Sequence, residues 1–211
     1  MKKILMFTII IIMIIVSVSL YIKHTKKNNY NIENEIILNS EGDFLLYIDD
    51  IQDNNGYLEV AGIISQGTID VDNEISIVGL GLKERNSKVI KLEFNNIEVK
   101  SAKAGDNVCI TLDSNIKKEH ITKGQSIITP GSTKPIFNID AQIVSDLSLK
   151  QIKEEANNFY INTDIKCSVT IISEGEKKIK IKLEKPIVVA GELEGLLKNE
   201  DRVIAKCKVN K

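Results

Sequence analysis

Turn-forming residues recur at short intervals through most of this chain, and they separate short segments in which apolar and polar residues alternate. Alternation is strict from Lys178 to Glu184, and Val203 to Val209 places Ala, Cys and Val on one face with lysines between them. A period of two is typical of half-buried strands, and many short strands favour a sandwich or barrel. The pattern therefore predicts an all-β fold. The turn signals are Asn55-Gly56, Gly67, Asp72-Asn73, Gly105-Asp106-Asn107, Lys123-Gly124, Glu174-Gly175 and Asn199-Glu200-Asp201.

One helix interrupts this pattern. Ser148 and Gln151 have the spacing of a capping box, and Leu147 with Ile152 has that of a hydrophobic staple. The pattern predicts a helix from Leu149 to about Asn157. Pro130-Gly131 and Pro135 divide the strand-rich region into two halves of similar size, which we expect to be two β domains, residues 43–131 and 135–211.

The N-terminus contains an apolar stretch without a charged residue, from Ile4 to Ile22. At about 1.5 Å per residue it would form roughly 28 Å of helix, close to the ~30 Å hydrocarbon core of a bilayer. Lysines flank both of its ends. The sequence predicts a basic segment at 1–3, a transmembrane signal-anchor at 4–22 and a polar juxtamembrane spacer at 23–42.

A cleaved signal peptide is the alternative for this segment. Ser17-Val18-Ser19 could serve as the cleavage site, but the apolar run continues to Ile22 and a basic stop, which favours an uncleaved single-pass anchor. Lysines at both ends leave the orientation open. We expect the C-terminal domains outside the cytoplasm, because an anchor this near the N-terminus usually exports a long C-terminal part. The bilayer is thus a predicted partner, through residues 4–22.

Charge argues against nucleic acid as a partner. Of the 28 basic residues, 23 lie beyond Lys27, together with all 29 acidic residues, which leaves a balance of −6. Nucleic-acid-binding domains are usually basic. The three cysteines, Cys109, Cys167 and Cys207, are widely spaced and form no C-x-x-C pair, which argues against a disulfide framework and a cysteine-rich zinc site. Cys167 and Cys207 fit an apolar core.

The strand-rich region carries an ordered series of signatures. It begins with Phe44-Leu45-Leu46-Tyr47-Ile48-Asp49-Asp50-Ile51, Val60-Ala61-Gly62-Ile63-Ile64, Gly67-Thr68-Ile69 and Val71 to Ile77, and it continues with Ala104 to Val108, Gly124-Gln125 and Pro130 to Pro135. In order and spacing these resemble the second domain of elongation factor Tu and its junction with the third. The C-terminal half resembles the third domain through Phe137 to Val144, Phe159 to Thr163, Lys185-Pro186-Ile187 and Arg202-Val203. The resemblance covers 43–211 and implies two packed antiparallel β-barrels.

The departures from that family bear on function. No G-x-x-x-x-G-K-[ST] loop is present, and Asp53-Asn54-Asn55-Gly56 lies where a hairpin turn is expected, so we predict no GTPase activity and no bound nucleotide. The family's Gly-Gly-Arg-His-Thr-Pro stretch, associated with the T-stem of tRNA, is replaced by Leu149 to Glu155. Tyr47 replaces a proline, and Ser65-Gln66 replaces a charged pair. The resemblance therefore does not extend to delivery of aminoacyl-tRNA.

No catalytic constellation is recognisable. His24 lies beside the apolar stretch, His120 is expected in an exposed loop, and neither belongs to a metal-ligand or nucleophile motif. Asp49-Asp50 and Glu154-Glu155 are interpreted as solvated charge. Asp49 and Asp50 make a poor catalytic dyad, because neighbours on a strand point to opposite faces. We assign no catalytic, cofactor-binding or metal residues, and no cofactor. Binding residues stay open.

These observations give a principal hypothesis and two alternatives. The first is a membrane-anchored, non-enzymatic interaction module that binds a protein partner. The second is a membrane-tethered protein, facing the cytoplasm, that associates with tRNA or the ribosome. The third is an enzyme on a repurposed barrel, for which no motif argues.

Overall fold

The computed structural model of the chain describes residues 41–161, 163–189, 191 and 193–209. The predicted anchor at 4–22, the segment at 1–3, and the spacer except for residues 41–42 lie outside this range. Within the described residues, no helix combines the length and the apolar character needed to cross a membrane.

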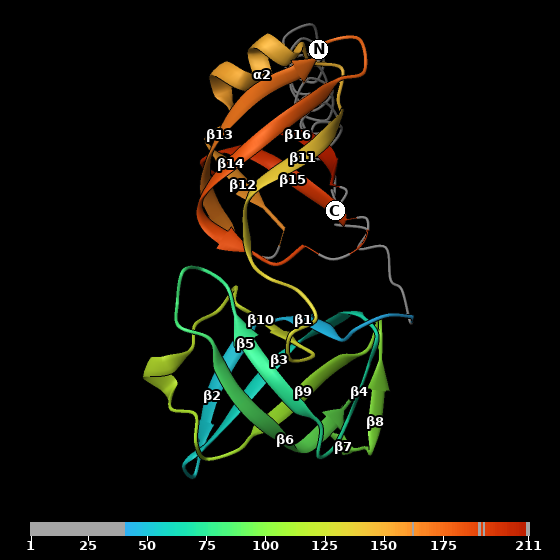
Figure 1. The fold of residues 1–211 in the computed structure, drawn as a ribbon, viewed down its shortest axis with the longest axis vertical. Helices are drawn as coiled ribbons and strands as arrows, with labels where there is room; N and C mark the ends of the chain where they lie inside the picture. The colour runs from blue at the N-terminus through green and yellow to red at the C-terminus, as the bar shows by residue number, and fades with distance from the viewer. Residues whose placement is uncertain (1–40, 162, 190, 192, 210–211) are drawn as a thin grey trace, which may run out of the picture. The chain divides into compact units, whose positions relative to one another are not determined.

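Ten strands, β1 to β10, form the first domain, which Figure 1 shows. Six of them close into a barrel in the order β1-β10-β5-β6-β9-β3, with β3 pairing back to β1. Strand β2 adds to β3, β7 adds to β6, and β4 pairs with β8 in a separate two-stranded sheet. The strands are β1 (Leu45–Tyr47), β2 (Asp50–Asn54), β3 (Tyr57–Gln66), β4 (Thr68–Asp70), β5 (Glu74–Val78), β6 (Arg85–Phe94), β7 (Ile97–Glu98), β8 (Ser101–Lys103), β9 (Asn107–Leu112) and β10 (Ser126–Ile128).

The predicted turn at Asn55-Gly56 joins β2 to β3. Both residues have positive φ, 53° at Asn55 and 87° at Gly56. This conformation matches the right-handed twist of two antiparallel strands, and Asn-Gly adopts it readily. Asp53 Oδ1 accepts a 3.1 Å hydrogen bond from the Gly56 N–H across the turn. The D-x-x-G-like stretch is thus part of a hairpin, as predicted.

Six strands close the second barrel, in the order β11-β14-β13-β12-β15-β16. Strand β14 confirms the predicted alternation, because Ile179, Ile181 and Leu183 are buried while the residues between them are exposed. The two predicted β domains are therefore two closed antiparallel barrels. The elements are β11 (Ile136–Val144), α2 (Leu149–Glu155), β12 (Asn158–Tyr160), β13 (Asp164–Ser173), β14 (Lys178–Ile187), β15 (Leu193–Asn199) and β16 (Arg202–Val209).

Helix α2 begins as predicted. The Ser148 hydroxyl accepts from the Gln151 N–H, and the Gln151 side chain accepts from the Ser148 N–H, which completes the capping box. The helix ends at Glu155 rather than near Asn157. The Asn157 N–H instead donates to the Lys198 carbonyl of β15, so strand pairing begins where the helix was expected to continue.

Both barrels belong to one compact unit of the chain. Buried Leu45, Tyr47, Val78 and Ile128 of the first barrel pack in the same apolar cluster as the interior of the second. The Leu80 N–H also donates a 2.7 Å hydrogen bond to the Pro186 carbonyl of β14. The remaining buried side chains of the first barrel, Phe44, Ile64, Leu92 and Ile110 among them, form a separate cluster inside it.

Candidate functional site: an acidic groove on the first barrel

The outer surface of the first barrel is hollowed over β2, β3, β9 and the end of β6. This groove has a volume of about 440 Å³. Its lining combines three carboxylates with several carboxamides, and few apolar groups. The residues are Asp50, Gln52, Glu59, Ala61, Glu93, Asn95, Asn96, Asn107, Val108 and Cys109.

Strand pairing brings these side chains together. Ala61 of β3 is paired with Asp50 of β2 on one side and with Cys109 of β9 on the other. Cys109 in turn is paired with Glu93 of β6. Residues directly opposite in a ladder point to the same face, so this row runs across four strands on one surface. The next row places Gln52 opposite Glu59.

Asp50 is the most strongly ion-paired carboxylate of the groove. Lys123 Nζ lies 2.7 Å from its Oδ1, and Gln52 Nε2 donates a 3.1 Å hydrogen bond to its Oδ2. The hydrogen bond from Lys123, followed by that from Gln52, lowers the pKa of Asp50 to about 2. The side chain is exposed, so the ion pair organises the surface and adds little stability.

The other two carboxylates also have partners. Lys91 Nζ lies 3.0 Å from Glu93 Oε1, and this contact raises the pKa of Lys91. Asn54 Nδ2 donates a 3.0 Å hydrogen bond to Glu59 Oε1. The groove therefore combines three carboxyl side chains with two lysines around them, so acidic side chains outnumber basic ones.

Cys109 lies on the floor of the groove, half-buried. Desolvation raises the pKa of its thiol, and the negative charges of Glu59 and Glu93 raise it further. A thiol held in its protonated form is a poor nucleophile and a poor metal ligand. Cys207 is fully buried, with its pKa raised by burial to about 12, and Cys167 packs against the second barrel's core. Both positions agree with the predicted apolar roles.

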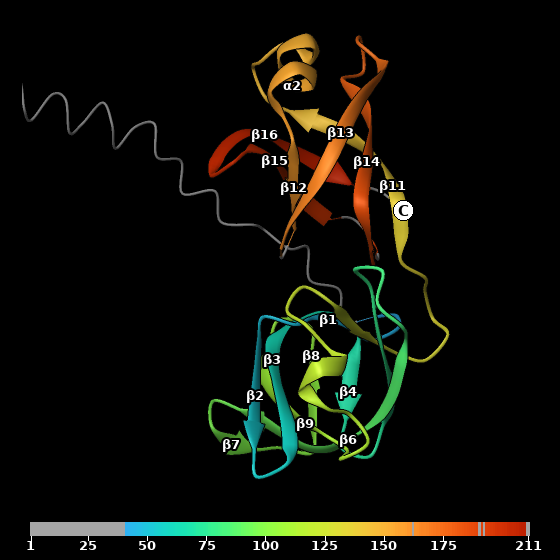
Figure 2. The same ribbon diagram turned by 90° about the vertical axis from the view of Figure 1, so that its left-hand side faces the viewer.

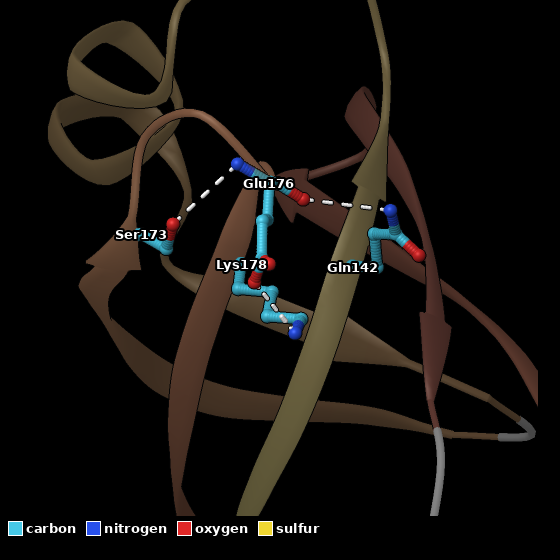
Figure 3. Close-up of polar contacts among 4 residues, drawn as sticks. All are labelled: Gln142, Ser173, Glu176 and Lys178. Atoms are coloured by element: carbon cyan, nitrogen blue, oxygen red, sulfur yellow. Dashed lines mark hydrogen bonds and ion pairs between the residues drawn. The ribbon is translucent and has the colours of Figure 1, made fainter.

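A second hollow lies beside the β13–β14 turn of the second barrel, where Gln142, Ser145 and Lys177 line it. Glu176 makes three contacts there, which Figure 3 shows. Its backbone carbonyl accepts a 3.4 Å hydrogen bond from Gln142 Nε2, and its N–H donates a 3.4 Å hydrogen bond to Ser173 Oγ. Its carboxylate forms a 2.6 Å ion pair with Lys178 Nζ. Lys177 Nζ donates to the Ser145 carbonyl at 2.7 Å. These contacts tie the turn to β11, which is a structural role.

The residues singled out by the sequence do not gather at either hollow, with the exception of Asp50 and Cys109. Asp49 and Asp50 were expected to be neighbours on one strand, but β2 begins at Asp50 and Asp49 lies just before it. His120 ends a 3-10 turn, Lys118–His120, where its Nδ1 accepts from the Lys117 N–H at 3.1 Å. Lys117, Lys118 and Glu119 are exposed and His120 is half-buried, so the expected exposed loop is an exposed segment that contains a 3-10 turn. His24 lies outside the described residues.

Glu155 is engaged away from the groove, where Arg202 Nη2 pairs with its carboxylate at 2.5 Å. No cluster of His, Cys, Asp or Glu in the described parts of the chain has the arrangement of a metal site. The groove itself was not predicted. Its signal in the sequence is the alternation of Asp50 with Gln52, but the partners on β3, β6 and β9 follow only from the strand order.

Comparison with known proteins agrees with the fold. The chain matches no protein-family model. It is 36% identical over 102 residues to the chloroplastic elongation factor Tu of Chaetosphaeridium globosum, an alignment that includes 47% of this chain. The aligned part is 25% of that relative, so the chain spans about a quarter of the relative's length. The similarity and the two closed barrels are together consistent with barrel domains like those of elongation factor Tu.

Proposed function

We propose that this protein is a membrane-anchored, non-enzymatic interaction module that binds a protein partner at the acidic groove of its first barrel. The anchor would be residues 4–22 and the spacer residues 23–42. The barrels at 43–131 and 135–211 would correspond to the second and third domains of elongation factor Tu. The groove is the observation that carries the proposal, because it gathers carboxylates from three strands, β2, β3 and β6, on one open surface.

The groove's chemistry favours a polypeptide with a cationic segment. Residues 43–131 contain 14 acidic and nine basic side chains, whereas residues 135–211 contain 12 acidic and 13 basic ones. The first barrel is thus the acidic half of the protein. An exposed apolar side chain lies beside the groove, because Ile63 of β3 is 40% exposed and is paired with Asn107, which lines the groove. Apolar contacts beside complementary charge are typical of protein interfaces.

The non-enzymatic role is supported by the chemistry of the groove. Cys109 keeps its proton, and each of the three carboxylates already accepts a hydrogen bond or an ion pair. An unpaired general base with a pKa near neutrality would suit catalysis better. Asp50, with its pKa lowered to about 2, is the opposite of such a base.

Topology is the first experiment. A C-terminal tag on the full chain is tested for digestion by protease added to intact cells, with lysed cells as the control. Loss of the tag from intact cells places the barrels outside the cytoplasm and supports the proposed location. Protection until lysis overturns the extracytoplasmic location.

Binding is tested by site-specific photo-crosslinking. A photoreactive residue at Asn96, on the groove, is compared with one at Lys153, an exposed position on α2. A discrete adduct from Asn96 only, which weakens in a Glu59→Gln, Glu93→Gln variant, supports a partner at the groove. Adducts that are equal at both positions, or that are unchanged by the double substitution, overturn it.

The similarity to elongation factor Tu favours one second candidate, a cytoplasm-facing protein that associates with tRNA or the ribosome. Phosphate contacts weaken steeply as salt rises. Salt-sensitive co-sedimentation of the full chain with ribosomes, together with a tag protected in intact cells, would support this candidate over the first. Absence of co-sedimentation even at low salt would exclude the ribosome as its partner.

A further inference from the structure

Strand β2 has an open edge. It pairs with β3 on one side, and among the described strands it is the longest with a single partner, because the others, β4, β7 and β8, have two or three residues each against its five. Figures 1 and 2 both show β2 beside β3 at the margin of the first barrel. The described strands of the second barrel form a closed ring, and none of them has such an edge. An open edge presents backbone groups that can pair with another extended chain.

The hairpin determines which groups face outward. Asn54 and Tyr57 flank the two-residue turn and are directly paired, as are Gln52 with Glu59 and Asp50 with Ala61. In such a hairpin the pair next to the turn exchanges both backbone hydrogen bonds, and so does every second pair along the ladder. The intervening residues, Ile51 and Asp53, therefore direct their N–H and C=O groups away from β3.

The chemistry of this edge is acidic. Natural sheets protect an edge with charged side chains, lysine especially, or with proline, and in β2 the charged side chains are two aspartates, Asp50 and Asp53. Pairing with β2 of a second copy would bring these aspartates near one another, and like charges opposed across strands are destabilising. A strand that carries lysine or arginine would instead meet opposite charge.

We propose that the partner binds by adding an extended, cationic segment to the open edge of β2, with basic side chains at alternate positions on the side of the groove. This mode rests on the proposed function and specifies the partner's chemistry. The added strand places every second side chain next to Asp50 and Gln52, within the roughly 5 Å that separates cross-strand neighbours. Backbone pairing provides affinity, and the carboxylates select the cationic side chains.

Lys123 has a defined part in this arrangement. Its Nζ forms an ion pair with Asp50 Oδ1 at 2.7 Å. The lysine side chain is 63% exposed, so it can move away from Asp50. Lys123 is the ion-pair partner of Asp50 while no segment is bound to the edge of β2. When a segment binds, one of its basic side chains replaces Lys123 in that ion pair. Lys123→Met then leaves Asp50 open and strengthens binding.

The test uses the full chain in detergent micelles and a fluorescent peptide of about ten residues with alternating Lys and Thr, long enough to cover a strand. Fluorescence anisotropy measures binding, and hydrogen exchange measures protection of the amides in residues 50–54. A matched peptide carries N-methyl groups on alternate residues along one edge, which removes backbone donors but keeps every charge. We expect the unmodified peptide to bind and to protect Ile51 and Asp53, and the N-methylated peptide to bind about tenfold or more weakly, a loss of about 1.4 kcal/mol.

Each result decides between the two proposals. Equal binding of both peptides overturns strand addition and leaves the groove as a site for a cationic segment. The proposal that the carboxylates select a cationic segment is overturned if peptide binding is not weakened by three substitutions, Glu59→Gln, Glu93→Gln and Asp50→Asn. If neither peptide binds while the Asn96 adduct persists, strand addition fails and the proposed function stands. Protection of β2 that rises with protein concentration and without peptide shows pairing between copies, which also overturns the proposal.

Discussion

The hydroxyl of Tyr47, on β1 of the first barrel, donates a 2.9 Å hydrogen bond to the carbonyl of Val188, just after β14 of the second. Both residues are buried, at 4% and 0% exposure. This contact gives a role to Tyr47, which stands where the resemblance to elongation factor Tu leads one to expect a proline. The side chain joins the two barrels through a buried polar contact. Removing the hydroxyl would leave a buried carbonyl without its partner.

Tyr47→Phe is therefore expected to lower the free energy of unfolding by about 1–2 kcal/mol. Burial raises the pKa of Tyr47 far above 10.0, so the unfolded state ionises first as pH rises. The stability from this group is full below pH 10 and is lost above it, and Tyr47→Phe should flatten that loss. Urea unfolding from pH 7 to 11 measures how the free energy of unfolding falls with pH. Tyr57→Phe, at an exposed site, is the control. Equal alkaline loss in wild type and Tyr47→Phe would contradict it.

Lys123→Met should raise the pKa of Asp50 from about 2 towards the ordinary aspartate value, because the largest cause of the shift is removed. The folded pKa is depressed, so the small stability that the pair provides is present above the unfolded pKa and is lost as pH falls towards 2. NMR titration of the Asp50 carboxyl carbon gives the pKa directly. Lys91→Met, which breaks the separate pair with Glu93, serves as control and should leave it unchanged.

Gly195→Ala should destabilise the second barrel. A Cβ at Gly195 would lie 2.5 Å from Cε2 and 2.6 Å from Cζ of Phe159, whose ring is fully buried. Overpacking of this kind costs about 1–3 kcal/mol. Gly175→Ala is the matched control, because no atom of the residues that the structure describes lies within 4 Å of the added Cβ. Thermal unfolding should show partial rescue when Gly195→Ala is combined with Phe159→Leu; strictly additive losses would argue against the clash.

Ser148→Ala should shorten or loosen α2 by removing one side of the capping box. The expected loss is about 1 kcal/mol, the usual value for an N-cap hydroxyl. Hydrogen exchange of the Gln151 amide, which donates to Ser148 Oγ, reports the local effect. Lys150→Ala changes the same helix without touching its cap, and comparable exchange in the two variants would contradict the prediction.

Local patterns predicted much of the fold. The alternation in β14, the Asn55-Gly56 turn and the Ser148 cap each depend on neighbouring residues, which a single sequence displays directly. The sequence predicts that α2 extends to about Asn157, two residues beyond its end at Glu155. The Asn157 N–H donates to the carbonyl of Lys198, some forty residues away, and no local sequence pattern predicts that hydrogen bond. The groove was missed for the same reason. Glu59 and Glu93 reach one surface only through the pairing of β3 and β6 with β9.

The closure of the first barrel has a consequence for its synthesis on the ribosome. Strand β1 pairs with β10, and the Phe44 N–H bonds to Thr129 Oγ1, 85 residues later. The ring of strands thus stays incomplete until nearly the last residue of that domain has emerged, and pairing across such a separation is slow to form. During that interval β1 and β5 lack the strand that joins them. We expect the first barrel to need protection from premature association while it is being translated, whereas the β2–β3 hairpin can form as soon as its own residues are free.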